Sequence, residues 1–130
     1  MSSGTLAMRV WREPGGTAVI TVTGEVDIAT VAVLRDQLFT LADTSCSVIV
    51  DLDQVSFIDA AGLGALVGAA RRADIHGASL QVVCGQPQTR ELFRLAGLDR
   101  RLRLARTRAE ALQALGATAD PQARGGEAAV

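Results

Sequence analysis

Residues 48–68 read VIVDLDQVSFIDAAGLGALVG, in which an apolar run of strand length is followed by an aspartate and then by a helical pattern with three glycines. Residues 47–52 hold a dense apolar run, which is typical of a central parallel strand covered on both faces. Asp59 is a good helix N-cap, and apolar residues then recur at helical spacing. The stretch therefore predicts a strand, a connection over residues 53–59, and a helix that ends near His76 and Gly77.

The segments before this stretch predict a hairpin and a helix. Residues 8–11 and 17–23 flank Pro14 and paired glycines, which favour a turn, and residues 24–27 close the second strand. Residues 29–42 carry an apolar helical face of Val31, Leu34, Leu38 and Leu41. The strand over residues 47–52 follows these elements along the chain.

The segments after this stretch predict two further strand and helix pairs. Residues 80–84 form a strand, and Pro87 opens a helix that ends at Gly97. Residues 102–104 form an edge strand, and residues 108–115 form a last helix. The predicted inward residues of these two helices are Leu92, Leu95 and Ala96, and Ala111, Leu112 and Leu115.

Length and order of elements predict one α/β domain. The chain has 130 residues, of which 48% are hydrophobic, so it is long enough for one core. A hairpin followed by alternating helices and strands predicts a mixed, mostly parallel sheet of about four or five strands with about four helices. We expect a flexible N-terminus over residues 1–6, the domain over residues 7–115, and a disordered tail over residues 116–130.

Composition excludes several classes of function. The net charge of -1 argues against nucleic acid as a direct partner. Lysine and tyrosine are absent, which removes Schiff-base lysines, the lysine of a phosphate loop and tyrosine acid–base groups. One histidine and two cysteines cannot build a zinc cluster, so no metal or cofactor is expected. No membrane span or leader is evident, which predicts a cytoplasmic protein. No nucleophile is placed beside a base, so no catalytic site is expected.

The glycines of residues 59–68 have two interpretations. Glycine costs about 1 kcal/mol relative to alanine within a helix, so something must approach Gly62, Gly64 and Gly68 closely. The structural interpretation is close packing of the helix on the sheet, and the functional one is a binding surface. A dinucleotide site is disfavoured, because Val67 stands where the third glycine of that fingerprint belongs.

A family resemblance is carried by residues 48–52, 57–64 and 92–98. These segments are similar to the STAS domain of bacterial anti-sigma factor antagonists, and residues 24–28 look like that family's first binding loop. The resemblance covers residues 7 to 115. It implies an antagonist that binds an anti-sigma factor of the serine kinase type and frees a sigma factor, a mechanism called partner switching. A STAS scaffold in a stress-signalling complex, or an accessory subunit of a membrane transporter, is the alternative.

The resemblance also implies a contact surface and a departure from the family. The implied partner-binding residues are Gly24, Glu25, Asp27, Asp59, Ala60, Ala61, Gly62, Leu63 and Gly64. The family usually has serine or threonine in the two positions after the aspartate, where this chain has Ala60 and Ala61. Neither alanine accepts phosphate, so the resemblance implies an antagonist that is constitutively active or otherwise regulated.

Other candidate groups remain open at this point. Ser56 and Thr30 are nearby hydroxyls that fit turn or cap roles, and Asp51, Asp53 and Asp59 fit alternation and capping better than catalysis. Seven arginines within residues 90–108 are either a solvated surface or a contact for an acidic partner or membrane. Cys46 and Cys84 should lie too far apart for a disulfide. The oligomeric state is left between a monomer and a weak homodimer.

Overall fold

The computed structural model describes residues 5–44 and 46–116. A helix over residues 108–116 follows the last strand. The other elements, in chain order, are β1 (Leu6–Arg12), β2 (Ala18–Val26), α1 (Val31–Ala42), β3 (Val48–Ile58), α2 (Ala60–Ile75), β4 (Leu80–Val83), α3 (Pro87–Leu95), the 3₁₀ helix η1 (Leu98–Arg100) and β5 (Arg103–Ala105).

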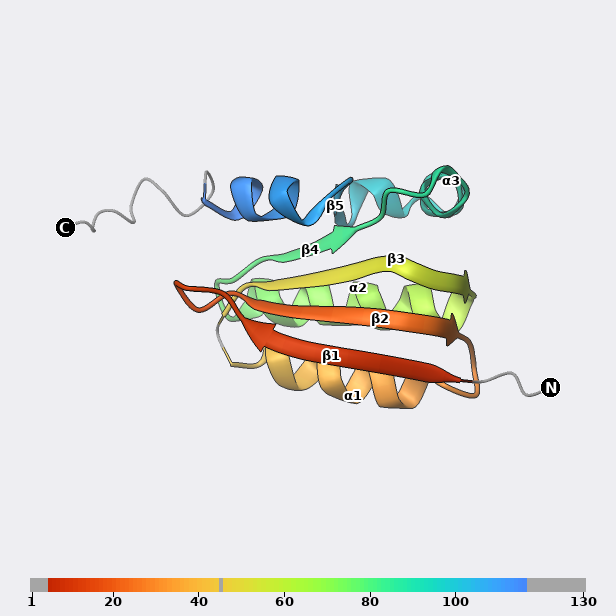
Figure 1. The fold of residues 1–130 in the computed structure, drawn as a ribbon, viewed down its shortest axis with the longest axis horizontal. Coiled ribbons are helices and arrows are strands. Elements are labelled where there is room, and N and C mark those ends of the chain that lie inside the picture. The colour runs from red at the N-terminus through yellow and green to blue at the C-terminus, as the bar shows by residue number, and fades with distance from the viewer. Residues whose placement is uncertain (1–4, 45, 117–130) are drawn as a thin grey trace.

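The strands form one five-stranded sheet in the order β1-β2-β3-β4-β5 (Figure 1). β1 pairs antiparallel with β2, as the predicted hairpin requires, and every other pair is parallel. β3 is central, in agreement with its apolar run. The mixed, mostly parallel α/β sheet predicted from the sequence is confirmed.

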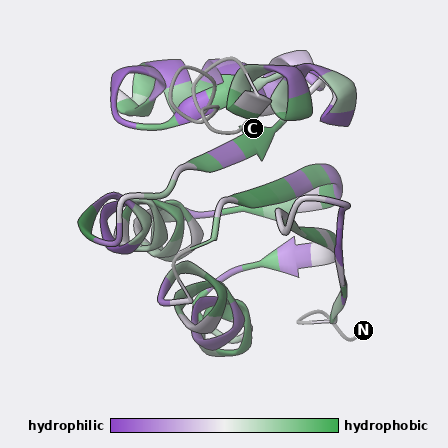
Figure 2. Cartoon of the chain, turned by 90° about the vertical axis from the view of Figure 1, so that its left-hand side faces the viewer, coloured by the Kyte–Doolittle hydropathy of each residue, from purple (hydrophilic) through white to green (hydrophobic). Residues whose placement is uncertain are grey.

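The two faces of the sheet are covered differently. α1 and α2 lie side by side on one face, where Ile20, Val50 and Leu66 belong to the main core (Figure 2). On the other face a smaller cluster forms around Val19 and Ile49, and the helix over residues 108–116 covers it with Ala111 and Leu115. In β2, residues 18, 20 and 22 therefore face the main core, residue 19 faces the smaller cluster, and apolar side chains are buried on both faces of the sheet.

β2 and β3 are longer than their sequences predict. Residues 24–27 were expected to close β2 and residues 53–59 to be a connection, but β2 continues to Val26 and β3 to Ile58. The ladder passes two register irregularities between these strands and resumes with Glu25 opposite Phe57. Such irregularities let a polar segment stay in the sheet although it breaks the alternating pattern.

The inward faces of two helices differ from the prediction. In α3 the buried side chain is Phe93, and Leu92 is partly buried against the main core as predicted. Leu95 is 69% exposed and Ala96 is exposed, which differs from the prediction. In the helix over residues 108–116, Ala111 and Leu115 are buried as predicted, but Leu112 is 37% exposed. A nine-residue helix with several apolar residues offers more than one apolar face, and only tertiary packing selects among them.

The helix ends follow the predicted chemistry. Asp59 caps α2, and Gly77 and Gly97 take positive φ angles of 75° and 74° after α2 and α3. β1 begins at Leu6, one residue before the expected domain boundary, and the last helix includes residue 116. The rest of the expected tail, over residues 117–130, and residues 1–4 lie outside the described residues.

Candidate partner-binding site

The candidate site forms where β2 and β3 end. The two strands are parallel, and Val26 lies opposite Ile58, so the segments that follow them emerge at the same edge of the sheet. The backbone N–H of Asp59 donates to the carbonyl of Val26 over 3.1 Å, which joins the two segments directly. The ladder thus brings together the two regions that the sequence singled out, the Asp27 loop and the beginning of α2.

Asp27 organises its own loop. Its Oδ1 accepts hydrogen bonds from the backbone N–H groups of Ala29 at 2.9 Å and Thr30 at 3.1 Å. The Thr30 hydroxyl donates to the carbonyl of Glu25 over 2.8 Å and accepts from the Asp27 N–H. Thr30 is buried, which confirms its structural role. The loop is therefore held in one shape before α1 begins.

Asp59 organises the beginning of α2 in the same way. Its Oδ1 accepts from the N–H groups of Ala61 at 3.0 Å and Gly62 at 3.3 Å, which confirms the predicted N-cap. Ser56 is exposed, and its hydroxyl donates to the carbonyl of Gly24 over 3.3 Å. The site is therefore a pair of loops, each of which is organised by Oδ1 of its own aspartate.

The three glycines of α2 have different surroundings. A Cβ on Gly62 would lie 2.6 Å from Val26 Cγ1 and 2.7 Å from Ile58 Cγ1, so this glycine lets the helix approach the sheet. A Cβ on Gly68 would lie 3.0 Å from Phe39 Cζ. Around Gly64 no atom lies within 4 Å of the added Cβ. The packing interpretation applies to the first two, and only Gly64 presents open surface.

The nine predicted site residues divide by accessibility. Ala60 and Gly64 are exposed, and Glu25, Asp27, Asp59 and Ala61 are partly exposed. Gly62 and Leu63 are buried and support the surface from below. Gly24 has a φ of 115°, and a Cβ there would meet the Thr5 carbonyl oxygen at 2.3 Å, so it serves the pairing of β1 with β2.

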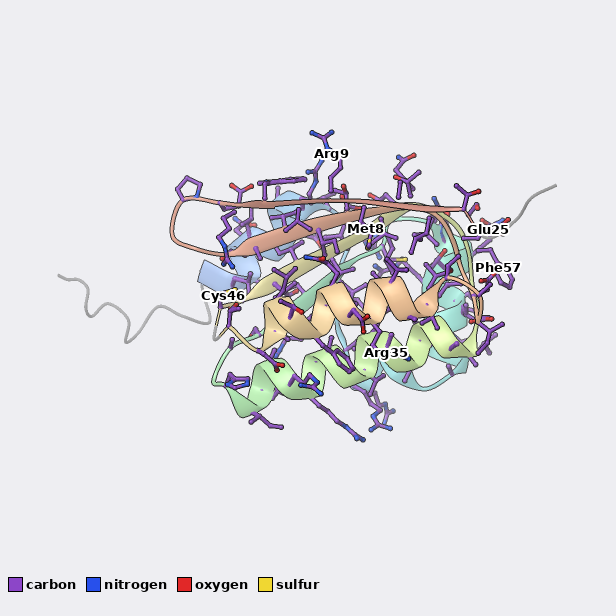
Figure 3. All side chains as sticks on the ribbon, turned by 90° about the horizontal axis from the view of Figure 1, so that it is seen from below. Met8, Arg9, Glu25, Arg35, Cys46 and Phe57 are labelled. Carbon is purple, nitrogen blue, oxygen red and sulfur yellow. The ribbon has the colours of Figure 1, made fainter. Side chains whose placement is uncertain are left out.

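Two exposed apolar side chains flank this surface. Ile28 lies in the predicted binding loop of residues 24–28 but was not among the named contact residues, and Phe57 was not assigned to the site. Ile28 in the Asp27 loop is 80% exposed, and Phe57 near the end of β3 is 52% exposed. Figure 3 shows Phe57 and Glu25 at the same end of the molecule. The signal for Phe57 was a large apolar residue two positions before the N-cap of α2, but residues 53–59 were interpreted as a connection.

A shallow groove continues from this surface along α2. It has a volume of about 380 Å³, and Leu63 and Val67 of α2 face Leu98 of η1 across it. Arg71 and Arg101 also line it. The exposed beginning of α2 is therefore bordered by an apolar depression, a shape that suits a protein partner.

The acidic residues outside this site have structural partners. Asp51 forms an ion pair with Arg108 at 3.1 Å, and Asp53 accepts from the Gly85 N–H at 2.8 Å. Among residues 5–44 and 46–116, no group of three or more His, Cys, Asp and Glu side chains is placed to hold a metal ion. His76 caps the end of α2 and lies 3.5 Å from Asp43.

The two cysteines are free thiols in different surroundings. Cys46 is partly buried and Cys84 is fully buried. Burial raises the pKa of the Cys84 thiol. Partial burial also raises the pKa of Cys46, but hydrogen bonds with Thr44 and Arg12 outweigh it, and the net pKa is lowered. No helix within the described part of the chain is both long and apolar enough to cross a membrane.

Comparison with known proteins gives consistent matches. A STAS domain family model matches residues 9–111. The anti-sigma-B factor antagonist of Bacillus subtilis is 32% identical over 79 residues, which are 61% of this chain and 72% of that protein. The anti-sigma-F factor antagonist RsfB of Mycobacterium tuberculosis is 32% identical over 98 residues, which are 75% of this chain and 80% of that protein.

Solved structures agree with these matches. An anti-sigma factor antagonist from Mycobacterium paratuberculosis superposes with a TM-score of 0.80 and 27% identity over 88% of this chain and 97% of that chain. The unphosphorylated anti-sigma factor antagonist SpoIIAA has a TM-score of 0.64 at 22% identity, covering 83% of this chain and 96% of its own, and supports the fold alone.

Proposed function

The chain belongs to the STAS domain family, and from that premise we propose that it is an antagonist of an anti-sigma factor of the serine kinase type. Its relatives in Bacillus subtilis and Mycobacterium tuberculosis are anti-sigma factor antagonists. On binding, this protein frees a sigma factor and so regulates transcription by partner switching, in the cytoplasm. The observation that carries the proposal is the exposed beginning of α2 beside Ile28 and Phe57, on a chain similar to such antagonists.

The geometry suits docking rather than chemistry. Ala60 and Gly64 are exposed and small, so a partner backbone can approach the first turns of α2 closely. Ile28 and Phe57 are exposed by 80% and 52%, and burying a large apolar side chain contributes about 1.5–3 kcal/mol. Aromatic anchors of this kind concentrate binding energy at interfaces. The Asp27 and Asp59 loops are fixed internally, which limits the entropy lost on binding.

The same surface explains the proposed lack of a phosphorylation switch. Ala60 and Ala61 occupy the positions after the capping Asp59, and neither carries a hydroxyl. A phosphate there would add a charge of about -1.5 to -2 beside a carboxylate and repel a partner fitted to the neutral surface. Without an acceptor, ATP should leave the complex intact. We therefore propose a constitutively active antagonist, or one that is controlled by other means.

The proposal is tested with a matched pair of charge insertions. Ala60 and Ala109 are both exposed in the first turn of a helix, where an added glutamate is favourable for the helix itself. Ala60→Glu should weaken binding to purified candidate anti-sigma kinases at least about tenfold in calorimetry. Ala109→Glu should bind like the wild type, and both should keep the wild-type melting temperature.

Phe57→Ala provides an independent variant of the same surface. The side chain is half-exposed, so its removal should cost little stability while it removes an anchor of the complex. Wild-type affinity in both Ala60→Glu and Phe57→Ala would refute the site. Failure of the wild type to bind any anti-sigma kinase would refute the function and favour a STAS scaffold or transporter subunit.

A further inference from the structure

The arginine-rich segment over residues 90–108 is only partly neutralised by the fold. Arg94 pairs with Glu91, Arg103 lies 3.8 Å from Asp74, and Arg108 pairs with Asp51. The side chain of Arg106 has no hydrogen bond or ion pair within the described residues. The segment is therefore not a uniform solvated surface, and its unpaired charge is concentrated at particular positions.

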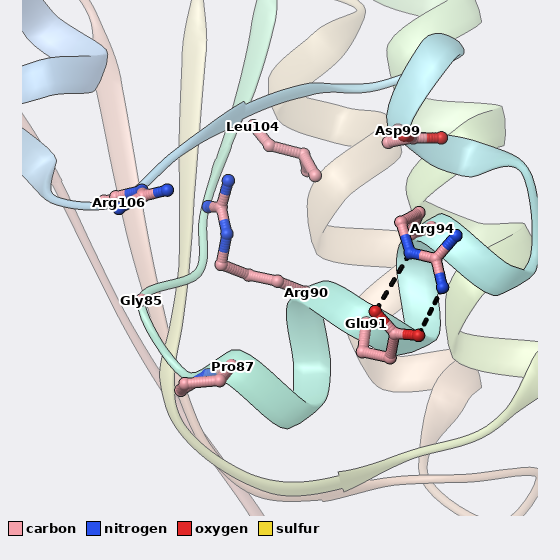
Figure 4. Close-up of a pocket in the computed structure, with 8 residues that line it drawn as sticks. All are labelled: Gly85, Pro87, Arg90, Glu91, Arg94, Asp99, Leu104 and Arg106. Carbon is pink, nitrogen blue, oxygen red and sulfur yellow. Dashed lines mark hydrogen bonds and ion pairs between the residues drawn. The ribbon is translucent and has the colours of Figure 1, made fainter.

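Arg90 and Arg106 both line a hollow of about 400 Å³ (Figure 4). The hollow lies between α3 and the carboxyl ends of β4 and β5, and its other walls include Pro87 and Leu104. Its size falls within the range of about 300–1,000 Å³ that is typical of small-molecule sites.

The two ends of the hollow differ in charge. At one end, Arg94 Nε donates to Glu91 over 2.9 Å, and this pairing raises the pKa of the guanidinium and lowers the pKa of the carboxyl. At the other end, Arg90 uses one N–H to donate to the carbonyl of Cys84 over 3.0 Å. A guanidinium carries five N–H donors, so Arg90 keeps most of its donors for a ligand.

Arg90 and Arg106 line the same hollow, and Figure 4 shows Arg106 and the Glu91–Arg94 pair on opposite sides of Arg90. Two carboxylates, Glu91 and Asp99, also line the hollow, and within the described residues neither forms an ion pair with Arg90 or Arg106. A phosphoryl group accepts paired hydrogen bonds from guanidinium groups, so two arginines that line one hollow provide the donor type that it requires. Leu104 and Pro87 are the apolar side chains of the lining, and Figure 4 shows them on opposite sides of Arg90.

We propose that this hollow binds a small phosphomonoester, with its phosphate on Arg90 and Arg106 and its organic part against Leu104 and Pro87. The site is separate from the proposed partner surface, which uses the Asp27 loop and the beginning of α2. It requires no chemistry on the ligand. The inference is independent of the anti-sigma factor antagonist role and is tested on the isolated chain.

The test is calorimetric titration of the full chain with phenyl phosphate and, separately, with inorganic phosphate. Phenyl phosphate should bind saturably and more tightly than inorganic phosphate, because only the ester contacts Leu104. Arg106→Gln should weaken phenyl phosphate binding at least about tenfold, since a charge-assisted pair is lost. Arg35→Gln, an exposed arginine of α1 on another face, is the matched control and should leave binding unchanged.

Glu91→Gln should change the affinity for phenyl phosphate in the direction opposite to Arg106→Gln. It removes a competing carboxylate and releases the Arg94 guanidinium, so phenyl phosphate should bind about threefold more tightly. The proposal is overturned if the wild type shows no saturable binding, or if Arg106→Gln matches the wild type. Equal affinity for inorganic phosphate and phenyl phosphate would overturn the assignment of an ester. Melting temperatures of all variants, measured in parallel, exclude unfolding as the cause of a lost signal.

Discussion

Alanine substitutions at Gly62 and Gly64 should have opposite effects on stability. Both glycines lie near the beginning of α2, and replacement by alanine gains up to about 1 kcal/mol of helix propensity at either position. At Gly62 the new Cβ would lie 2.6 Å from Val26 Cγ1 and 2.7 Å from Ile58 Cγ1, whereas at Gly64 it meets no atom within 4 Å. Val26 and Ile58 are buried and β-branched, so they cannot rotate away cheaply.

The comparison of the two variants isolates the cost of overpacking. Inserting a methyl group into a packed core costs about 1–3 kcal/mol, and the propensity gain is common to both variants. Gly62→Ala should therefore be about 1–3 kcal/mol less stable than Gly64→Ala, and Gly64→Ala should be at least as stable as the wild type. Urea unfolding followed by far-UV circular dichroism measures the difference. Equal stability of the two variants would refute the close packing of α2 on the sheet.

Three further predictions concern the cap, the core and the thiols. Asp59→Ala should destabilise the protein by about 0.5–2 kcal/mol in urea unfolding because the Ala61 and Gly62 N–H groups lose their acceptor, whereas Asp59→Asn should retain most of the stability; equal losses would contradict the cap. Phe93→Ala should cost about 3–5 kcal/mol in the same assay because the side chain is fully buried, and a loss below about 1 kcal/mol would contradict its place in the core. Cys46 should be alkylated by iodoacetamide at a lower pH than an ordinary thiol, because its lowered pKa supplies thiolate earlier, and Arg12→Gln should move that profile to higher pH. Peptide mapping should find Cys84 unmodified in the folded protein, and faster labelling of Cys84 would contradict both assignments.

Local chemistry explains why much of the fold could be predicted. The apolar run over residues 47–52 requires cover on both faces, and β3 is the central strand. Asp59, Gly77 and Gly97 act as helix-end signals, and each signal depends only on a few neighbouring backbone groups. Such features depend on only a few neighbouring residues, so they can be predicted from the sequence alone.

The misplaced features depend on contacts between distant segments. β3 extends to Ile58 because β2 continues to pair with it past the register irregularities. The polar residues at 53 and 54 interrupt the apolar pattern, so the sequence alone does not show this extension. Phe93 is the buried residue of α3 because its side of the helix packs against the main core. In the sequence, Leu95 fits an apolar helical face equally well. The exposure of Phe57 likewise depends on the ladder that places it at the edge of the site.

The central claim is that this protein forms a complex with an anti-sigma kinase that ATP does not dissolve. The direct measurement follows complex size and intact mass over time, with ATP present, for the wild type, Ala60→Ser and Ala61→Ser. The account predicts that the wild-type complex persists with unchanged mass, while a serine variant gains one phosphate and dissociates. Phosphorylation of the wild type with release of the kinase would contradict the account.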